Sequence, residues 1–198
     1  MAWDANTVVL ESQKLVEGVF AVIPVDADEM ASKGLPIDTT SGFVIGTKAV
    51  LVVRSTLNQR LQKELFKLIS AETNLLVRYM VNTIFHGDHF YGIFYLPEEV
   101  FIIQHAIAKA YIEFHFEADT AFMMQNFSQG RDIREDCPTD ADILIGDGGS
   151  LTENLGDISV DIRDYGYAQT GGDLFVSVPS ANTLWTGNLV IAKEPAVP

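Results

Sequence analysis

Two histidines and an aspartate stand within four residues of one another, at His86, Asp88 and His89. They come shortly after an apolar stretch, residues 75–81, which predicts a β-strand. Imidazole and carboxylate groups at the carboxyl end of a strand are well suited to hold a metal ion or to transfer protons. We therefore interpret His86, Asp88 and His89 as candidate metal ligands, and Asp88 also as a candidate general base.

The segments before this cluster predict a sheet followed by an amphipathic helix. Residues 15–25 and 43–53 are rich in Val, Ile and Phe, and the second stretch is broken by a turn at 46–48, which is typical of antiparallel strands. Ser55 and Thr56 are each able to cap a helix. Beyond them, leucines recur at helical spacing, at Leu57, Leu61, Leu65 and Leu68.

The segments after the cluster predict a strand at 100–103 and a helix over 104–127. A strand, a helix and another strand in succession indicate a crossover unit, and hence a mixed sheet covered by helices. His105 and His115 fall on the predicted helix, where we expect solvated or core-edge side chains and not metal ligands. A polar loop at 128–142 then leads to further short strands, predicted at residues 143–145, 151–153, 158–163, 173–178 and 183–185.

The composition indicates one globular α/β domain over residues 1–198. The chain is 47% hydrophobic and 20% charged, with a formal net charge of -14. This acidity argues against a nucleic-acid groove or an anionic membrane surface, because both attract clustered Lys and Arg. No apolar run approaches the roughly 20 residues that span a bilayer. The lone Cys137 and the absence of a secretory signal in residues 1–7 favour a reducing, cytoplasmic location.

The cluster resembles the signature of the metallo-β-lactamase superfamily, Asn-Thr-His-x-His-x-Asp-His followed by Gly. The matching positions are Asn82, Thr83, His86, Gly87, Asp88, His89 and Gly92. The position of the first signature histidine is occupied by Ile84. The resemblance implies a four-layer αβ/βα sandwich of two mixed sheets flanked by helices. It also implies that the second half is incomplete at the C-terminus, since the last histidine of the family would lie beyond Pro198.

Three further segments extend the resemblance along the chain. Residues 41–53 are similar to the first hairpin of the family, which ends in an aspartate where this chain has Arg54. Residues 169–173 are similar to a His-Thr-x-Gly-Asp segment whose histidine is a metal ligand, and here that position is Gln169. Residues 186–188 are similar to the segment whose aspartate bridges two metals, and here that residue is Asn188.

These departures dismantle the metal site that the resemblance implies. The first metal would be held by Ile84, His86 and Gln169, of which only the histidine is a good ligand. The second would retain Asp88 and His89 without the bridging carboxylate. Neither set reaches the three protein ligands typical of catalytic zinc. We expect no metal, or one weakly bound divalent metal at His86, Asp88 and His89, with zinc as the expected ion.

Arg54 introduces a permanent positive charge at this point. A guanidinium close to Asp88 would replace part of the missing metal charge and could hold the carboxylate through two hydrogen bonds. We therefore hypothesise an Arg54–Asp88 pair, with Ile84, Gln169 and Asn188 lining the site at the lost ligand positions.

Three classes of function remain open from the sequence. The first is a metal-poor, inactive member of the fold that binds a small molecule or a protein partner. The second is a hydrolase that uses one metal at His86, Asp88 and His89, or a metal-independent one in which Asp88 or His89 is the general base. The third is a structural subunit, in which the domain pairs with a catalytically competent relative and only its surface matters. A homo-oligomer also stays open. The fold alone does not choose among them.

Overall fold

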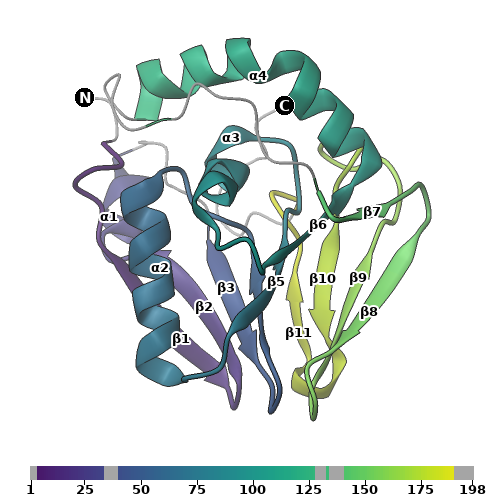
Figure 1. Cartoon of the computed structure of the whole chain (residues 1–198). Coiled ribbons are helices and arrows are strands. Elements are labelled where there is room, and N and C mark those ends of the chain that lie inside the picture. The colour runs from purple at the N-terminus through teal and green to yellow at the C-terminus, as the bar shows by residue number, and fades with distance from the viewer. Residues whose placement is uncertain (1–3, 34–39, 128–132, 134–140, 190–198) are drawn as a thin grey trace.

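The computed structural model of the protein describes residues 4–33, 40–127, 133 and 141–189, shown in Figure 1. Cys137 lies outside these residues. In the part of the chain that the structure describes, none of the helices is both long and apolar enough to cross a bilayer.

The larger of two sheets is mixed. Its seven strands follow the order of the chain: β1 (Leu10–Val16), β2 (Val19–Pro24), β3 (Ser41–Ile45), β4 (Val50–Val53), β5 (Val77–Val81), β6 (Phe101–His105) and β7 (Ile143–Ile145). The pairs from β1 to β4 are antiparallel, and those from β4 to β7 are parallel. The predicted opening meander and crossover units are therefore confirmed.

The start of this sheet differs from the sequence prediction. Residues 15–25 were expected to form one strand, but the chain reverses at Gly18, whose φ of 74° is in the left-handed region. The strand before this turn, β1, lies at the edge of the sheet, and most of its residues are exposed. An exposed edge strand needs no apolar alternation, so hydrophobic periodicity cannot reveal it.

The second sheet is smaller, and all its described pairings are antiparallel. Its strands are arranged in the order β11-β10-β9-β8. The strands are β8 (Ser150–Asn154), β9 (Ser159–Arg163), β10 (Phe175–Val178) and β11 (Thr183–Trp185). A short 3-10 turn, η2 (Pro179–Ala181), joins the last two.

The helices pack on the larger sheet. They are α1 (Ala27–Ser32), α2 (Gln59–Glu72), α3 (Gly87–Phe90), the 3-10 helix η1 (Tyr91–Tyr95) and α4 (Ala106–Phe127). The predicted amphipathic helix is α2, but its cap is Asn58, whose side chain accepts a hydrogen bond from the Leu61 amide. Neither Ser55 nor Thr56 caps it, because the chain first completes a turn through residues 55–58.

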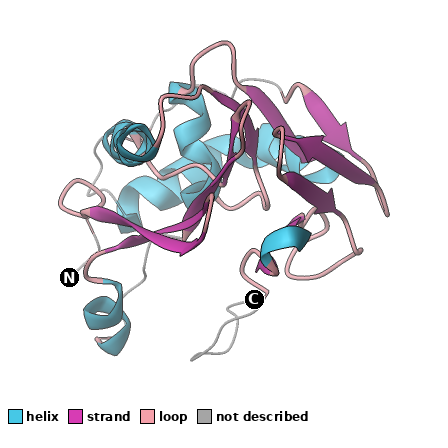
Figure 2. Ribbon diagram, turned by 90° about the horizontal axis from the view of Figure 1, so that it is seen from below, coloured by secondary structure: helices cyan, strands magenta, loops and turns pink. Residues whose placement is uncertain are grey.

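Alternating side chains of the central strands divide the core in two. On β4, Val50 and Val52 belong to the core that contains the buried face of α2, whereas Leu51 and Val53 belong to the core shared with the second sheet. Because successive residues of a strand point to opposite faces, a fully apolar strand is needed between these two layers. Figure 2 shows the resulting layers of helices and two sheets from below.

The parallel strands bring the segments of interest to one edge. The carboxyl ends of parallel strands lie on the same side of a sheet. Arg54 follows β4, residues 82–89 follow β5, and His105 ends β6. Loops from the second sheet reach the same region, because the Leu174 amide donates a 2.9 Å hydrogen bond to the Thr83 carbonyl.

Candidate functional site

The loop after β5 is fastened to its neighbours before it reaches the histidines. The Asn82 amide donates to the Ile103 carbonyl at 2.9 Å, and Asn82 Nδ2 donates to Gln104 Oε1 at 3.1 Å. Ile84 is fully buried. The start of the loop therefore has a rigid position between β6 and the second sheet.

The segment that follows forms the short helices α3 and η1. Glycine is required at two places for lack of space. A Cβ on Gly87 would lie 2.9 Å from Met123 Cγ, and one on Gly92 would lie 2.7 Å from the Thr56 amide nitrogen and 2.9 Å from Ser55 Cβ. These clashes explain physically why the motif has glycine at both positions.

His86 and Asp88 face a cavity, whereas His89 points into the protein. His89 is fully buried, and its Nε2 lies 3.5 Å from Asp88 Oδ2. Neither ring nitrogen of His89 makes a hydrogen bond with any described residue. Burial, together with the electrostatic effect of Arg54 and of the neighbouring His86, lowers the pKa of His89 well below its usual value. His89 is therefore neutral at physiological pH.

Two opposing effects act on the pKa of the Asp88 carboxyl group. Burial raises the pKa of its carboxyl group, while His86, Arg54 and a backbone hydrogen bond act to lower it. The raised pKa means that desolvation prevails over the attraction of these positive charges. A carboxyl group of this kind can exchange a proton more readily near neutral pH than an exposed aspartate can.

Arg54 is buried and has a left-handed backbone, with φ of 64°. Its Nε donates to Thr83 Oγ1 at 3.0 Å, and its Nη1 donates to the Thr40 carbonyl at 3.2 Å. The third nitrogen, Nη2, lies near Gly187, 3.6 Å from where a Cβ would be. Its charge acts on Asp88, as expected. The direct Arg54–Asp88 pair stays a prediction.

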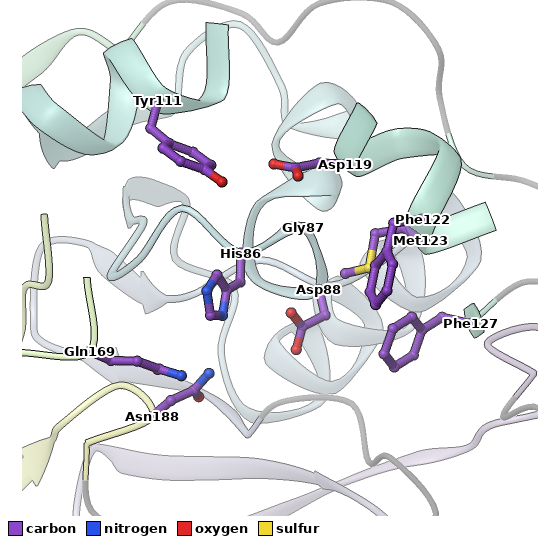
Figure 3. Close-up of a pocket in the computed structure, with 10 residues that line it drawn as sticks. All are labelled: His86, Gly87, Asp88, Tyr111, Asp119, Phe122, Met123, Phe127, Gln169 and Asn188. Atoms are coloured by element: carbon purple, nitrogen blue, oxygen red, sulfur yellow. The ribbon is translucent and has the colours of Figure 1, made fainter. Parts of the chain in front are cut away.

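Four of the residues singled out from the sequence line one cavity of about 420 Å³, shown in Figure 3. They are His86, Asp88, Gln169 and Asn188, whose side chains point toward one another from the loop after β5 and from two loops of the second sheet. The other lining residues are Gly87, Tyr111, Asp119, Phe122, Met123 and Phe127. Five of these come from α4, and none of the five was predicted from the sequence.

The α4 residues give the cavity two chemically different sides. Asp119 contributes a second carboxyl group, and burial raises its pKa while His115 and His86 oppose the rise. Phe122, Met123 and Phe127 form an apolar wall beyond it. Tyr111 stacks on Phe85 with ring centroids 3.7 Å apart, which anchors the helix to the histidine loop.

Comparison with known proteins identifies the fold. No family model and no curated protein sequence matches the chain. Solved structures do match: the protein TMB-1 superimposes with a TM-score of 0.67 at 14% identity, covering 95% of this chain and 74% of that one. The chain has the metallo-β-lactamase fold. A metallo-β-lactamase from Pontibacter korlensis gives 0.65 at 15% identity, over 94% of this chain and 74% of the other. The metallo-β-lactamase DIM-1 gives 0.62 at 17% identity, over 95% and 74%.

Within the metallo-β-lactamase fold, the donor set of this chain does not fit two zinc ions. Ile84 has no donor atom and lies in the protein interior. Gln169 and Asn188 offer neutral amide oxygens, which are weak zinc ligands compared with imidazole or carboxylate. Among the four residues that the sequence pointed to and that line the cavity, only His86 and Asp88 are good zinc ligands.

A second cluster of potential ligands lies outside this cavity. Among the described residues, one group of three His, Cys, Asp or Glu side chains has its ligand atoms all within 4.8 Å of one another, namely His105, Asp147 and Asp164. These residues could hold a metal ion. The prediction that His105 lies on a helix with a solvated or core-edge side chain was wrong: His105 is the last residue of β6 and is fully buried.

Proposed function

We propose that this protein binds a small molecule in the 420 Å³ cavity and does not catalyse two-metal hydrolysis. The observation that carries the proposal is the lining of the cavity, in which His86, Asp88, Gln169 and Asn188 share one space with an apolar wall. Small-molecule sites of this size are commonly mostly apolar, with a few converging polar groups.

The donor set argues against the two-metal reaction. In that reaction a metal ion lowers the pKa of bound water from 15.7 to about 7 and so supplies hydroxide at neutral pH. Catalytic zinc sites have three protein ligands, and of the residues at the first ion's positions, Ile84, His86 and Gln169, only the histidine is a good ligand. Ligand binding needs no such set, and it accommodates every one of the substitutions.

The two carboxyl groups that line the cavity favour a ligand with a basic group. Asp88 and Asp119 both line it, and burial raises the pKa of both carboxyl groups. An ammonium group on the ligand would stabilise the ionised carboxylates and form charge-assisted hydrogen bonds with them. The aromatic rings of Phe122 and Phe127 suit the apolar part of such a ligand.

Three probes with one ring and different head groups test this idea: benzylamine, benzyl alcohol and benzoate. In ligand-observed NMR, benzylamine should bind most tightly, benzyl alcohol less tightly and benzoate least tightly. Asp119→Asn should weaken the binding of benzylamine about tenfold, because one charge-assisted contact is lost. Phe122→Ala should weaken the binding of all three probes. Glu117→Gln, on an exposed residue of the same helix, is the matched control. Failure of all three probes to bind, or equal binding to the Asp119→Asn variant, would contradict the proposal.

One observation favours a second candidate, a hydrolase with a single metal at His86, Asp88 and His89. Both nitrogens of the buried His89 ring lack a hydrogen-bond partner among the described residues, and such groups usually have a ligand, a water molecule or an ion beside them. Metal analysis after growth with zinc, manganese and iron in turn tests this alternative. Hydrolysis of an ester, lactone, thioester and phosphodiester panel that is lost on joint replacement of His86 and His89 by alanine would favour it over ligand binding.

A further inference from the structure

His105 stands at the junction between β6 and α4 and caps the helix with its ring. Its Nδ1 accepts a 3.1 Å hydrogen bond from the backbone amide of Ile107. An accepting Nδ1 carries no proton, so in the neutral ring the proton is on Nε2. The cap therefore fixes the orientation of the ring and directs Nε2 away from the helix.

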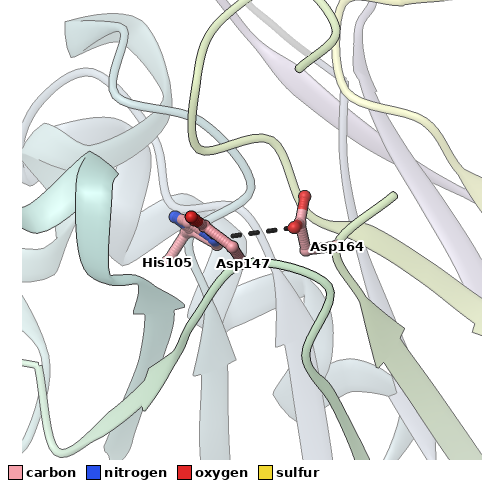
Figure 4. Close-up of side chains that lie close together, drawn as sticks. All are labelled: His105, Asp147 and Asp164. Carbon is pink, nitrogen blue, oxygen red and sulfur yellow. Dashed lines mark ion pairs between the residues drawn. The ribbon is translucent and has the colours of Figure 1, made fainter. Parts of the chain in front are cut away.

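Nε2 of His105 lies close to two carboxylates, and Figure 4 marks its ion pair with Asp164 by a dashed line. It lies 3.6 Å from Asp147 Oδ1 and 3.8 Å from Asp164 Oδ2, and it makes no hydrogen bond with any described residue. These separations are too long for direct hydrogen bonds. They are close to the separation of two ligand atoms that each lie 2.0 to 2.4 Å from a shared cation, which is roughly 3 to 4 Å.

Asp164 is held in place for this role. It is buried, and it accepts backbone hydrogen bonds from Gly148 at 2.6 Å and from Gly166 at 2.8 Å. Both glycines have φ in the left-handed region, 66° and 94°, which permits the tight turns that aim their amides at the carboxylate. A buried carboxylate is costly unless it is paired, and the amides and a neutral imidazole compensate its charge only in part.

Asp147 leaves the group open to solvent. Its side chain is 86% exposed, whereas those of His105 and Asp164 are buried. Asp147 and Asp164 also line a cavity of about 520 Å³ together with Tyr165 and Tyr167. Two buried ligands, one exposed ligand and space for water are the features of an accessible metal site.

We propose that His105, Asp147 and Asp164 bind one divalent transition-metal ion, separately from the cavity at His86 and Asp88. One imidazole and two carboxylates suit Zn²⁺ or Mn²⁺ better than Mg²⁺ or Ca²⁺, which prefer all-oxygen ligands. The net charge of -14 favours cation binding in general. None of these three residues occupies a position of the metallo-β-lactamase signature.

Binding requires a change of tautomer at His105. The metal ion takes the Nε2 lone pair, the proton leaves Nε2, and Nδ1 gains a proton, so His105 releases no net proton. The protonated Nδ1 no longer accepts the hydrogen bond from Ile107. One neutral cap bond is lost while three bonds to the metal form, and coordination by two anionic ligands outweighs that loss.

The experiment is calorimetric titration of chelator-treated protein with ZnCl₂ and MnCl₂. We expect one ion per chain, at least tenfold weaker binding in Asp147→Asn, and no change in Glu98→Gln, which alters another exposed carboxylate. Because Asp147 is exposed, its substitution leaves the fold intact. Absence of binding, or binding that is equally tight in wild type and Asp147→Asn, would overturn the proposal.

A second readout identifies the ligands directly. The Ile107 amide should become less protected from hydrogen exchange when zinc binds to the wild type, and it should not change in Asp147→Asn. Electron spin-echo spectroscopy of the Mn²⁺ complex should show coupling to one imidazole nitrogen. A manganese spectrum without nitrogen coupling would remove His105 from the site and refute the proposed ligand set.

Discussion

Arg54 Nε donates a 3.0 Å hydrogen bond to Thr83 Oγ1, so a buried guanidinium joins the end of β4 to the loop that follows β5. Arg54 adopts a left-handed φ, which is unfavourable for a side chain of this size. The bonds to Thr83 and to the Thr40 carbonyl compensate this strain. The same charge acts on Asp88 and His89, so Arg54 connects the stability of the loop with the electrostatics of the cavity.

Arg54→Met is expected to reduce the free energy of unfolding by about 2 kcal/mol, because it removes a charge-assisted hydrogen bond and leaves a buried Thr83 hydroxyl unsatisfied. Urea unfolding of Arg54→Met, Thr83→Val and the double variant would measure the coupling free energy between the two side chains, which should be about 1 kcal/mol. Arg78→Met, on an exposed residue of β5, is the control and should be near neutral. Strict additivity of the two substitutions would show that the bond contributes nothing.

Gly92→Ala should destabilise the protein by about 1 to 3 kcal/mol, because the added methyl group meets the Thr56 amide and Ser55 Cβ, which lie in a packed turn. Gly146→Ala supplies the matched comparison. A Cβ at Gly146 has nothing within 4 Å, so this change should be neutral. Thermal unfolding of the two variants distinguishes them. Equal melting temperatures would mean that residues 55–58 move to accommodate the methyl group without loss of stability.

Much of the fold was predictable because the signals are local. The apolar runs in β4 and β5 follow from burial of both faces of the sheet, and the leucine spacing in α2 follows from burial of one face of the helix. The six-residue helix α1 and the exposed edge strand β1 leave no such pattern. Asn58 was missed as the cap because helix ends depend on the exact course of the preceding turn.

The site was only partly predictable for a different reason. The segments bearing His86, Asp88, Gln169 and Asn188 were placed by resemblance, and the structure brings them to one cavity. Asp119 lies on a helix that was predicted, but the face that meets the cavity depends on tertiary packing. His105, Asp147 and Asp164 belong to three separate segments, and only the pairing of β6 with β7 and the turn after β9 bring them together.

Restoring histidine at position 84 should not restore a metal site. Ile84 is fully buried and does not line the cavity, so Ile84→His places a polar ring in the core and should cost about 2 to 4 kcal/mol of stability. Gln169→His combined with Asn188→Asp changes two residues that do line it, and this variant should gain zinc affinity. Urea unfolding and zinc titration of both variants provide the test. A stable Ile84→His protein that binds zinc better than the double variant would show that the loop can rearrange.

Tyr91 should make the protein less stable at high pH. Its ring is buried, and its hydroxyl group lies 2.6 Å from Thr120 Oγ1. Burial raises the pKa of Tyr91 to about 12, so between pH 10 and 12 the unfolded chain loses this proton while the folded chain retains it. The free energy of unfolding should therefore fall as pH rises through this window, by up to about 1.4 kcal/mol per pH unit from this residue.

Urea unfolding at pH 9 and pH 11 measures the effect on stability, compared with Tyr91→Phe. The variant should be less stable at pH 9, because it leaves the Thr120 hydroxyl without its partner, and its stability should fall less steeply toward pH 11. Tyr167→Phe, at an 83% exposed residue, should follow the wild type at both values. Burial raises the pKa of Tyr79 and Tyr111 as well, so the decisive quantity is the difference between wild type and Tyr91→Phe. An identical pH dependence in the two proteins would show that the Tyr91 hydroxyl ionises as readily in the folded state as in the unfolded state.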